Sequence, residues 1–397
     1  MGRPEFIALM AMMFATIAFS IDAMLPALPE IASELSPQEP SRAALILTSF
    51  ILGMGIGTFF SGPLSDAFGR RTIMLWGAGL YILSAAVAWL SQSLEVMLVA
   101  RLFQGVGAAG PRIVSIAIIR DLFSGREMAR ILSFVMIIFT LVPAFAPALG
   151  ALIIEFAGWR SIFLAFVVFS LLSVLWLAVR LPETLAVEDR RPLQWPLMID
   201  AVRQMFDQPV VRISIFVQTL TMAILFSVLV LIQPTYQFVF DRLESFPYWF
   251  GAIALSSALA SFLNALLVMR FGMRRLITVA MVGQILLSSV VLLFFNSIPA
   301  GGFALFAVWQ GFVFFQVGLS IGNLNAIAME PMGHIAGMAA SVIGAFSTVI
   351  AALIATPAAL MFDGTIRPIV GTALVLACAA FALMVQMGRI EARQPAE

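Results

Sequence analysis

Three ionisable side chains stand inside long apolar segments of this sequence: Asp22, Arg101 and Arg112. A charged group at bilayer depth costs roughly 2.5 to 3.5 kcal/mol on insertion scales, so it usually faces a cavity and has a function. Asp22 and Arg101 come at the same depth in their segments, at about 1.5 Å of rise per residue. We predict that Asp22 takes up and releases protons in a proton-coupling role, with Arg101 adjusting its affinity for them. The alternative is a fixed ion pair that holds the two segments together.

Arg112 and three glutamines add polar groups that could contact a substrate. Arg112 follows Arg101 by 11 residues. At about 100° per residue, this spacing puts both arginines on one helix face. The second half of the chain has no charge in the middle of an apolar segment, but it has Gln218, Gln310 and Gln316 there. We predict a largely apolar cavity lined by Asp22, Arg112 and these glutamines, which would suit lipophilic compounds.

The composition places these residues in an all-α polytopic membrane protein. Hydrophobic residues make up 62% of the 397 residues and charged residues 11%, whereas a soluble domain carries about 25% charged residues. The first apolar segment is too long for the core of a signal peptide, so we expect it to remain as a span. A hydropathy window of about 19 residues predicts 12 spanning helices at 6–30, 42–64, 72–91, 95–119, 129–154, 160–180, 212–238, 247–269, 276–296, 302–328, 336–360 and 368–388.

Several classes of function are excluded or made weak by the same composition. Cys378 has no second cysteine to pair with, and the single histidine, His334, belongs to no zinc-binding pattern. A net charge of +1 gives no basic surface for nucleic acid. No GxxxxGK[ST] motif is present, so ATP is not the direct driving force. We expect no metal or cofactor, and an enzyme is the weakest hypothesis because no nucleophile and base stand together inside the spans.

The positions of the arginines predict the orientation of the chain. Cytoplasmic loops retain positive charge during membrane insertion. If the N-terminus lies inside, sixteen of the 22 arginines fall in inner loops and tails, four fall in outer loops, and two lie within spans. Both termini are therefore predicted to be cytoplasmic.

A short repeat predicts that the chain has two similar halves. The residues FGRR at 68–71 recur as FGMRR at 271–275, about one half of the chain later. Two six-helix halves, 1–181 and 212–397, are the simplest explanation, as in transporters built from internal repeats. The charged, proline-bearing residues 182–211 would form a cytoplasmic connector that is partly helical.

Several motifs resemble those of one transporter family. The segment GPLSDAFGRR at 62–71 resembles the signature between the second and third spans of the major facilitator superfamily. The segment 101–109 resembles the signature in the fourth span of its proton-coupled members. The segments 21–29 and 330–341 are similar to the bicyclomycin-resistance branch of its drug/proton antiporters. This resemblance covers nearly the whole chain. It implies the major facilitator fold and a bacterial inner membrane as the location. Because one bundle of twelve spans can work alone, we expect a monomer.

The resemblance also implies a gate at the inner end of the second and third spans. Asp66, in the inner loop, would stabilise the start of the span at 336–360 or pair with Arg120. Asp66 is replaced by Met269 in the second copy, so the gate should be asymmetric. Pro143 and Pro147 should bend the fifth span, because each removes a backbone hydrogen bond. The complete set of gating residues that we predict is Asp66, Gly69, Arg70, Arg71, Arg120, Pro143 and Pro147.

These observations predict a secondary exporter that exchanges lipophilic or amphiphilic compounds, such as chloramphenicol-like or bicyclomycin-like drugs, for protons by alternating access. A proton-coupled importer of a small anionic metabolite is the alternative if Arg101 and Arg112 jointly bind an anion. A receptor or scaffold that binds a ligand without transporting it is a third possibility from a different class.

Overall fold

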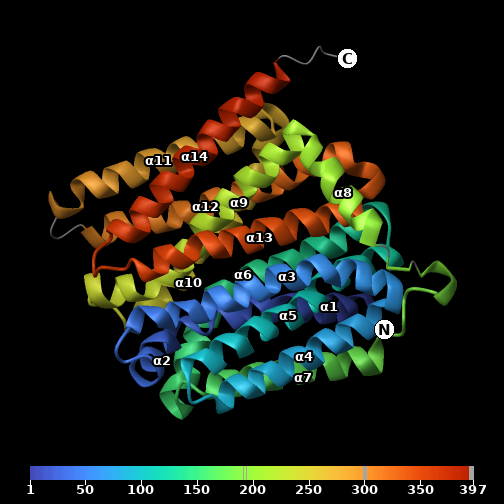
Figure 1. Cartoon of the computed structure of the whole chain (residues 1–397), viewed down its shortest axis with the longest axis horizontal. Helices are drawn as coiled ribbons and strands as arrows, with labels where there is room; N and C mark the ends of the chain where they lie inside the picture. The colour runs from blue at the N-terminus through green and yellow to red at the C-terminus, as the bar shows by residue number, and fades with distance from the viewer. Residues whose placement is uncertain (191, 194, 298–301, 393–397) are drawn as a thin grey trace. The chain divides into compact units, whose positions relative to one another are not determined.

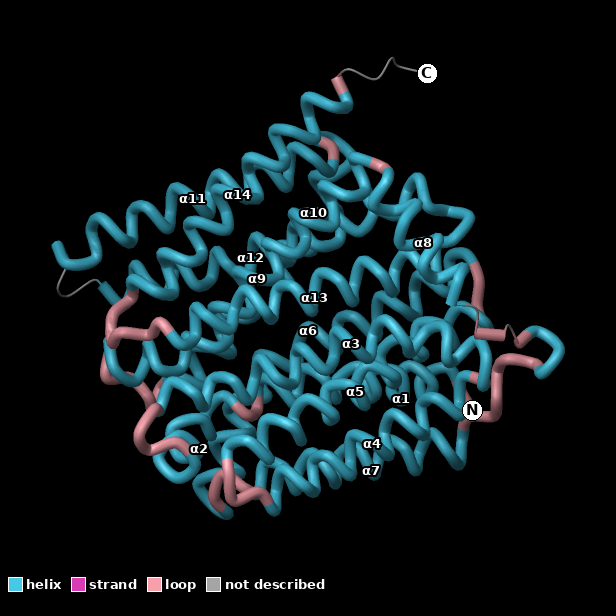
Figure 2. The backbone as a smooth tube through the Cα atoms, in the orientation of Figure 1, coloured by secondary structure: helices cyan, strands magenta, loops and turns pink. Residues whose placement is uncertain are grey.

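A computed structural model describes residues 1–190, 192–193, 195–297 and 302–392 of the chain (Figure 1). Within these ranges the regular structure is entirely helical (Figure 2). Twelve of the helical segments are long and apolar enough to cross a membrane, which confirms the predicted fold class and all 12 spans. Arg191 and Arg393, two of the arginines counted as cytoplasmic, lie outside the described residues. The chain divides into two compact units, Met1–Trp195 and Pro196–Glu397.

Unit 1 contains six of the spanning segments. Its helices are α1 (Arg3–Asp22), η1 (Leu25–Ala27), α2 (Leu28–Leu35), η2 (Pro40–Ala44), α3 (Leu45–Phe68), α4 (Arg70–Leu90), α5 (Leu94–Leu122), α6 (Gly125–Ala157), α7 (Ser161–Arg180) and η3 (Val187–Asp189). Helix α5 packs against α1, α3 and α4, while α1 also packs against α6 and α7. Figure 1 shows α1, α3, α4, α5 and α7 running side by side.

Unit 2 contains the other six spanning segments. Its helices are α8 (Trp195–Asp207), α9 (Pro209–Pro234), η4 (Thr235–Val239), α10 (Phe246–Phe271), α11 (Met273–Phe294), η5 (Phe295–Ser297), α12 (Gly302–Met329), η6 (Glu330–Ile335), α13 (Ala336–Leu360) and α14 (Arg367–Glu391). Helix α9 is central, since it packs against α12, α13 and α14.

The helices extend beyond the apolar segments from which they were predicted. Asp66, which we placed in a loop, lies inside α3, and Arg70 begins α4. Gly69 alone joins the two helices, and its φ of 102° is a conformation that an L side chain rarely adopts. The signature at 62–71 is therefore a corner between two helices rather than a flexible loop.

Helices α3 and α5 are held together by close backbone contact. A Cβ atom added to Gly105 of α5 would lie 2.0 Å from the carbonyl oxygen of Phe50, and one added to Gly53 of α3 would lie 1.9 Å from that of Leu102. Small residues at such crossings let membrane helices approach closely, and packing then replaces the hydrophobic driving force that lipid removes. These glycines fix α5, which carries both membrane-embedded arginines.

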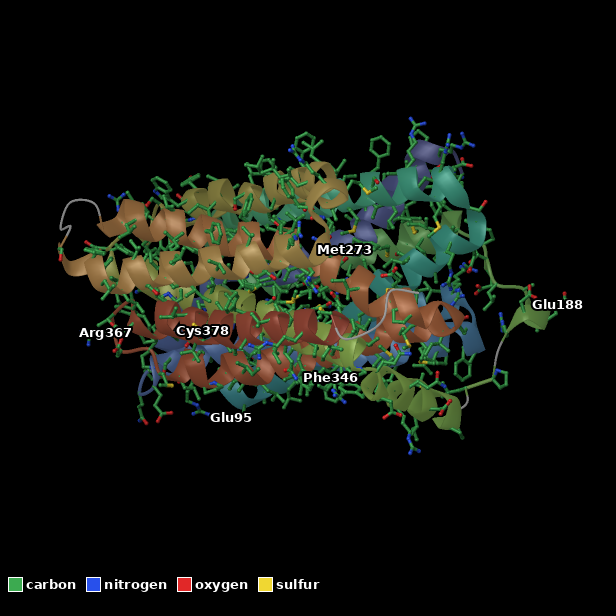
Figure 3. All side chains as sticks on the ribbon, turned by 90° about the horizontal axis from the view of Figure 1, so that it is seen from above. Glu95, Glu188, Met273, Phe346, Arg367 and Cys378 are labelled. Carbon is green, nitrogen blue, oxygen red and sulfur yellow. The ribbon has the colours of Figure 1, made fainter. Side chains whose placement is uncertain are left out.

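Residues 182–211, the predicted connector, contain one substantial helix, α8. Helix α8 belongs with unit 2 and buries Met198 and Met205. Phe206 at its end stacks edge-on against Phe216 of α9 and Phe346 of α13, with ring centroids 6.2 and 5.1 Å away. Phe346 is labelled in Figure 3. The preceding turn η3 carries Glu188, which Figure 3 shows away from the long helices.

Candidate functional site

Asp22 stands at a break in the first spanning segment. Helix α1 ends at Asp22, and the chain continues through the short turn η1 before α2 begins. Pro26 explains the break, since it lacks the N–H that would bond the carbonyl of Asp22 four residues earlier. The side chain is only 5% exposed, and among the described residues nothing hydrogen-bonds or ion-pairs with its carboxylate. Asp22 is thus a buried carboxylate whose oxygens accept no hydrogen bond from the described residues.

Gly150 lets α6 pack closely against the chain at the end of α1. A Cβ atom at Gly150 would lie 2.1 Å from the carbonyl oxygen of Ala23, the residue that follows Asp22. The backbone of α6 therefore touches the chain beside the carboxylate, and any side chain at Gly150 must displace it.

We expect Gly150→Val to displace the break next to Asp22. Because the clash is with backbone rather than with a flexible side chain, we expect a loss of about 1 to 3 kcal/mol of stability together with reduced transport. Thermal unfolding in detergent and uptake by vesicles would measure the two effects. Gly79→Val in α4 is the matched control, since nothing lies within 4 Å of a Cβ there. Equal behaviour of the two variants would contradict the expected contact.

Arg101 is fully buried and binds backbone rather than a carboxylate. Its guanidinium donates to the carbonyl oxygen of Ser20 at 3.1 Å, to that of Ile46 at 3.4 Å, and to Gln104 Oε1 at 2.8 Å. It also lies 4.3 Å from the centre of the Phe50 ring. Arg101 therefore joins α1, α3 and α5.

The break at Asp22 supplies one of these acceptors. In a continuous helix the carbonyl of Ser20 would accept from the N–H of Met24, but α1 ends before that bond can form. Arg101 donates to this carbonyl instead. Among the described residues no ion pair joins Asp22 to an arginine, so the fixed ion pair considered as the alternative is not formed in this structure.

A tyrosine that the sequence did not single out completes the network. The hydroxyl of Tyr81 in α4 lies 2.5 Å from Ser20 Oγ, which also donates to the carbonyl oxygen of Thr16 at 2.6 Å. Both side chains are buried. The signal that could have indicated this contact is weak: Tyr81 is one of only three tyrosines in the chain, and it stands within an apolar segment.

Arg112 differs sharply from Arg101. It is half-buried within α5, and in the part of the chain that the structure describes no ion pair or hydrogen bond involves its guanidinium. An arginine deep in a spanning helix without a protein partner retains its donors for water or a ligand.

The three glutamines that we predicted to line a cavity all lie in unit 2 and are buried. Gln218 and Gln316 both have buried side-chain atoms to which the described residues offer no hydrogen bond, and for Gln316 this holds for both Oε1 and Nε2. Gln310 accepts a hydrogen bond of 2.9 Å from the hydroxyl of Tyr236, while its Nε2 has no partner. Buried amides without partners are costly, so these groups are candidates for contact with water or a ligand.

The corner at Gly69 carries a cluster of buried charge. Arg70 ion-pairs with Asp66 and with Asp121 of α5, the latter at 2.9 Å, and also donates to Ser65 Oγ at 2.7 Å. The structure thus pairs Asp66 with Arg70 and not with Arg120. Among the described residues Arg120 makes no ion pair, and its neighbour Asp121 joins the cluster instead. This cluster links the ends of α3, α4 and α5.

Glu183, at the start of the connector, caps this corner. Its carboxylate accepts from the backbone N–H groups of Arg70 at 2.9 Å and Arg71 at 3.1 Å. These are first-turn donors of α4, where a negative charge is favourable. The guanidinium of Arg71 donates to the carbonyl oxygen of Ala178 at 2.6 Å. Sequence reasoning missed Glu183 and Asp121; the only available signal was an acid just beyond the sixth span.

Helix α6 runs without interruption through both of its prolines. Pro143 and Pro147 lie inside Gly125–Ala157. Each lacks an N–H, so the carbonyls of Phe139 and Pro143 have no helical donor four residues later. A weakened hydrogen-bond ladder here is compatible with the predicted gating role.

Comparison with known proteins identifies the family of the chain. The model of the Major Facilitator Superfamily matches residues 8–356. A bicyclomycin resistance protein homolog of Haemophilus influenzae is 29% identical over 355 residues, 89% of this chain and 88% of that protein. Multidrug resistance protein MdtL of Shewanella oneidensis is 31% identical over 329 residues, 82% of this chain and 81% of its own.

Solved structures show the same fold. The crystal structure of a D-xylose-proton symporter superposes with a TM-score of 0.76 at 16% identity, covering 96% of this chain and 97% of the symporter. Together with the family match over most of the sequence and the 12 spanning helices, this resolves the question of class: the chain is a membrane transport protein that belongs to the Major Facilitator Superfamily.

Proposed function

We propose that this transporter exports lipophilic or amphiphilic compounds in exchange for protons. The observation that carries the proposal is Asp22, a buried carboxylate at a helix break with no protein partner among the described residues. Such a group can bind a proton or a cationic substrate, and exclusive use of the site by one or the other couples the two fluxes. The relatives named for bicyclomycin and multidrug resistance support drugs as the substrate class.

The roles of the two arginines follow from their different surroundings. Arg101 would act by positioning, because its donors hold the broken end of α1 against α3 and α5. Arg112 and the glutamines Gln218, Gln310 and Gln316 would contact substrate, because each retains donors or acceptors that no described residue uses. Because most of the other residues are apolar, the remaining contacts would accept substrates of varied shape.

A second candidate function is favoured by Arg112 alone. An unpartnered guanidinium inside a span would attract an anion, as expected for a proton-coupled importer of a small anionic metabolite. In that case Arg112→Gln would abolish transport of the anion, whereas in a drug exporter the same change would alter substrate preference without stopping export.

We further propose an inner-membrane location with both termini in the cytoplasm, as the arginine distribution indicates, and function as a monomer. The two transport halves would be 1–181 and 212–397, joined by 182–211. The cluster of Asp66, Arg70 and Asp121, with Gly69 and Arg71 beside it, would act as a switch, because its ion pairs link the ends of α3, α4 and α5.

Proton movement in vesicles tests the proposed function. Energised everted membrane vesicles containing the full chain would be challenged with bicyclomycin, chloramphenicol and lipophilic cationic dyes while internal pH is followed by a fluorescent amine. We expect compound-dependent proton efflux, absent from vesicles without the protein. If no compound releases protons but a small anion loaded into the vesicles leaves together with protons, the importer would replace the exporter.

A further inference from the structure

Unit 2 has an apolar groove at the end where α10 finishes and α11 begins. The groove has a volume of about 580 Å³ and lies between α10, α11 and α14. Its walls include Leu267 and Phe271 of α10, Val279 of α11 and Val385 of α14. All four are accessible rather than buried, so the groove opens on the surface of the unit. In Figure 1, α11 and α14 lie side by side.

Positive charge borders the apolar part of this groove. Arg274 and Arg275, in the first turn of α11, both line it. Arg274 ion-pairs with Glu391 of α14, and Gly388 leaves room for it, since a Cβ there would lie 3.3 Å from its guanidinium. Arg275 is exposed, and the described residues offer it no ion pair. The groove therefore has an apolar body and an unneutralised cationic edge.

The corresponding corner in unit 1 is neutralised, which makes the difference informative. There Arg70 pairs with two carboxylates, and Glu183 caps the first turn of α4. In unit 2 the position of Asp66 is occupied by Met269, which is 91% exposed. Among the described residues no side chain accepts from the first-turn N–H groups of α11, which Met273 begins (Figure 3). The second copy thus has two arginines and a helix N-terminus in the first turn of α11, but Met269 and Met273 stand where unit 1 has Asp66 and Arg70. No described side chain caps this turn as Glu183 caps that of α4.

We propose that this groove binds an anionic phospholipid. Its phosphate would lie against Arg275 and the first turn of α11, where positive charge and free N–H groups favour an anion. One acyl chain would occupy the apolar groove between α10, α11 and α14. This end of unit 2 is also the proposed cytoplasmic end, where bacterial anionic lipids are available to it. A free anion would gain nothing from the apolar walls, which is why a lipid is the occupant that fits both parts.

Lipid binding to the purified full-length protein tests the proposal. Native mass spectrometry would count phosphatidylglycerol and phosphatidylcholine bound to the chain and to Arg275→Gln and Val279→Trp. We expect a preference for phosphatidylglycerol, reduced roughly fivefold by Arg275→Gln, because each arginine near an anionic lipid contributes about that factor. Val279→Trp should lower binding of the same lipid by filling the groove. Both positions are exposed, and size-exclusion profiles would confirm folding.

A matched control separates this site from general surface charge. Arg126→Gln removes an exposed arginine of unit 1 that makes no ion pair with described residues, so it should leave phosphatidylglycerol binding unchanged. Equal loss in Arg126→Gln and Arg275→Gln would overturn the proposal. So would equal affinity for phosphatidylcholine, or displacement of bound phosphatidylglycerol by inorganic phosphate. None of these measurements depends on transport, so the lipid site stands or fails independently of the proposed export.

Discussion

Asp22→Asn is expected to abolish compound-dependent proton efflux and leave a folded protein. The amide has nearly the shape of the carboxylate but cannot take up or release a proton. Because the native carboxylate makes no ion pair or hydrogen bond with the described residues, its replacement breaks no protein contact. The expected signal in everted vesicles is that of vesicles without the protein, while thermal unfolding in detergent stays within about 0.5 kcal/mol of the native value.

Two further variants make the Asp22 result specific. Asp22→Glu keeps an ionisable group and should retain measurable coupling, with altered substrate preference because the longer side chain reaches further. Glu155→Gln removes an exposed acid of α6, for which the described residues provide no ion pair, and should behave as native. Full proton efflux in Asp22→Asn would exclude Asp22 from coupling. If Asp22→Asn also fails to exchange substrate across the membrane in the absence of a proton gradient, Asp22 would instead be assigned to substrate binding alone.

The spans could be predicted from the sequence because the bilayer leaves few alternatives. Backbone groups in lipid must bond within their own helix, so length and hydropathy suffice to find the segments. Their ends were less certain, since helices continue into the interface, where hydropathy falls. Asp66 shows the consequence: its polar surroundings suggested a loop, whereas α3 runs on to Phe68 and leaves only Gly69 as the link.

The charged members of the candidate site could be found, but their partners could not. A lone Asp22 or Arg101 in an apolar segment is conspicuous in the sequence alone. The residues that surround such a group are determined by packing between helices that are distant in the chain. The contact of Tyr81 with Ser20 is an example. The break at Asp22 was within reach, because Pro26 follows it by four residues. The three-dimensional structure was needed to show that this break frees the backbone carbonyl of Ser20 and that Arg101 binds it.

Arg70→Gln is expected to destabilise unit 1 by about 3 kcal/mol, because removing one partner of a buried ion pair leaves the others unpaired and desolvated. The arginine is almost fully buried, whereas Asp66 and Asp121 are 44% and 18% exposed, so water relieves part of the penalty. Arg70→Lys should recover only part of the loss, since an ammonium group lacks the fork of donors that reaches both carboxylates and Ser65. Equilibrium unfolding in mixed detergent would measure each change. Arg120 is an exposed neighbour to which the described residues offer no ion pair, so the free energy of unfolding of Arg120→Gln should remain within about 0.5 kcal/mol of the native value.

A double-mutant cycle then separates the ion pairs from other effects of the Arg70 substitution. Combining Arg70→Gln with Asp121→Asn should cost less than the two single changes added together, because the second change removes a carboxylate that the first leaves unpaired. Additive losses would show that the cluster contributes no mutual stabilisation and would remove the basis for a switch at this corner. A positive coupling together with slowed compound-dependent proton efflux in Arg70→Gln would connect the cluster to the transport cycle, since a merely structural ion pair would change unfolding and leave the turnover of the folded protein unaltered.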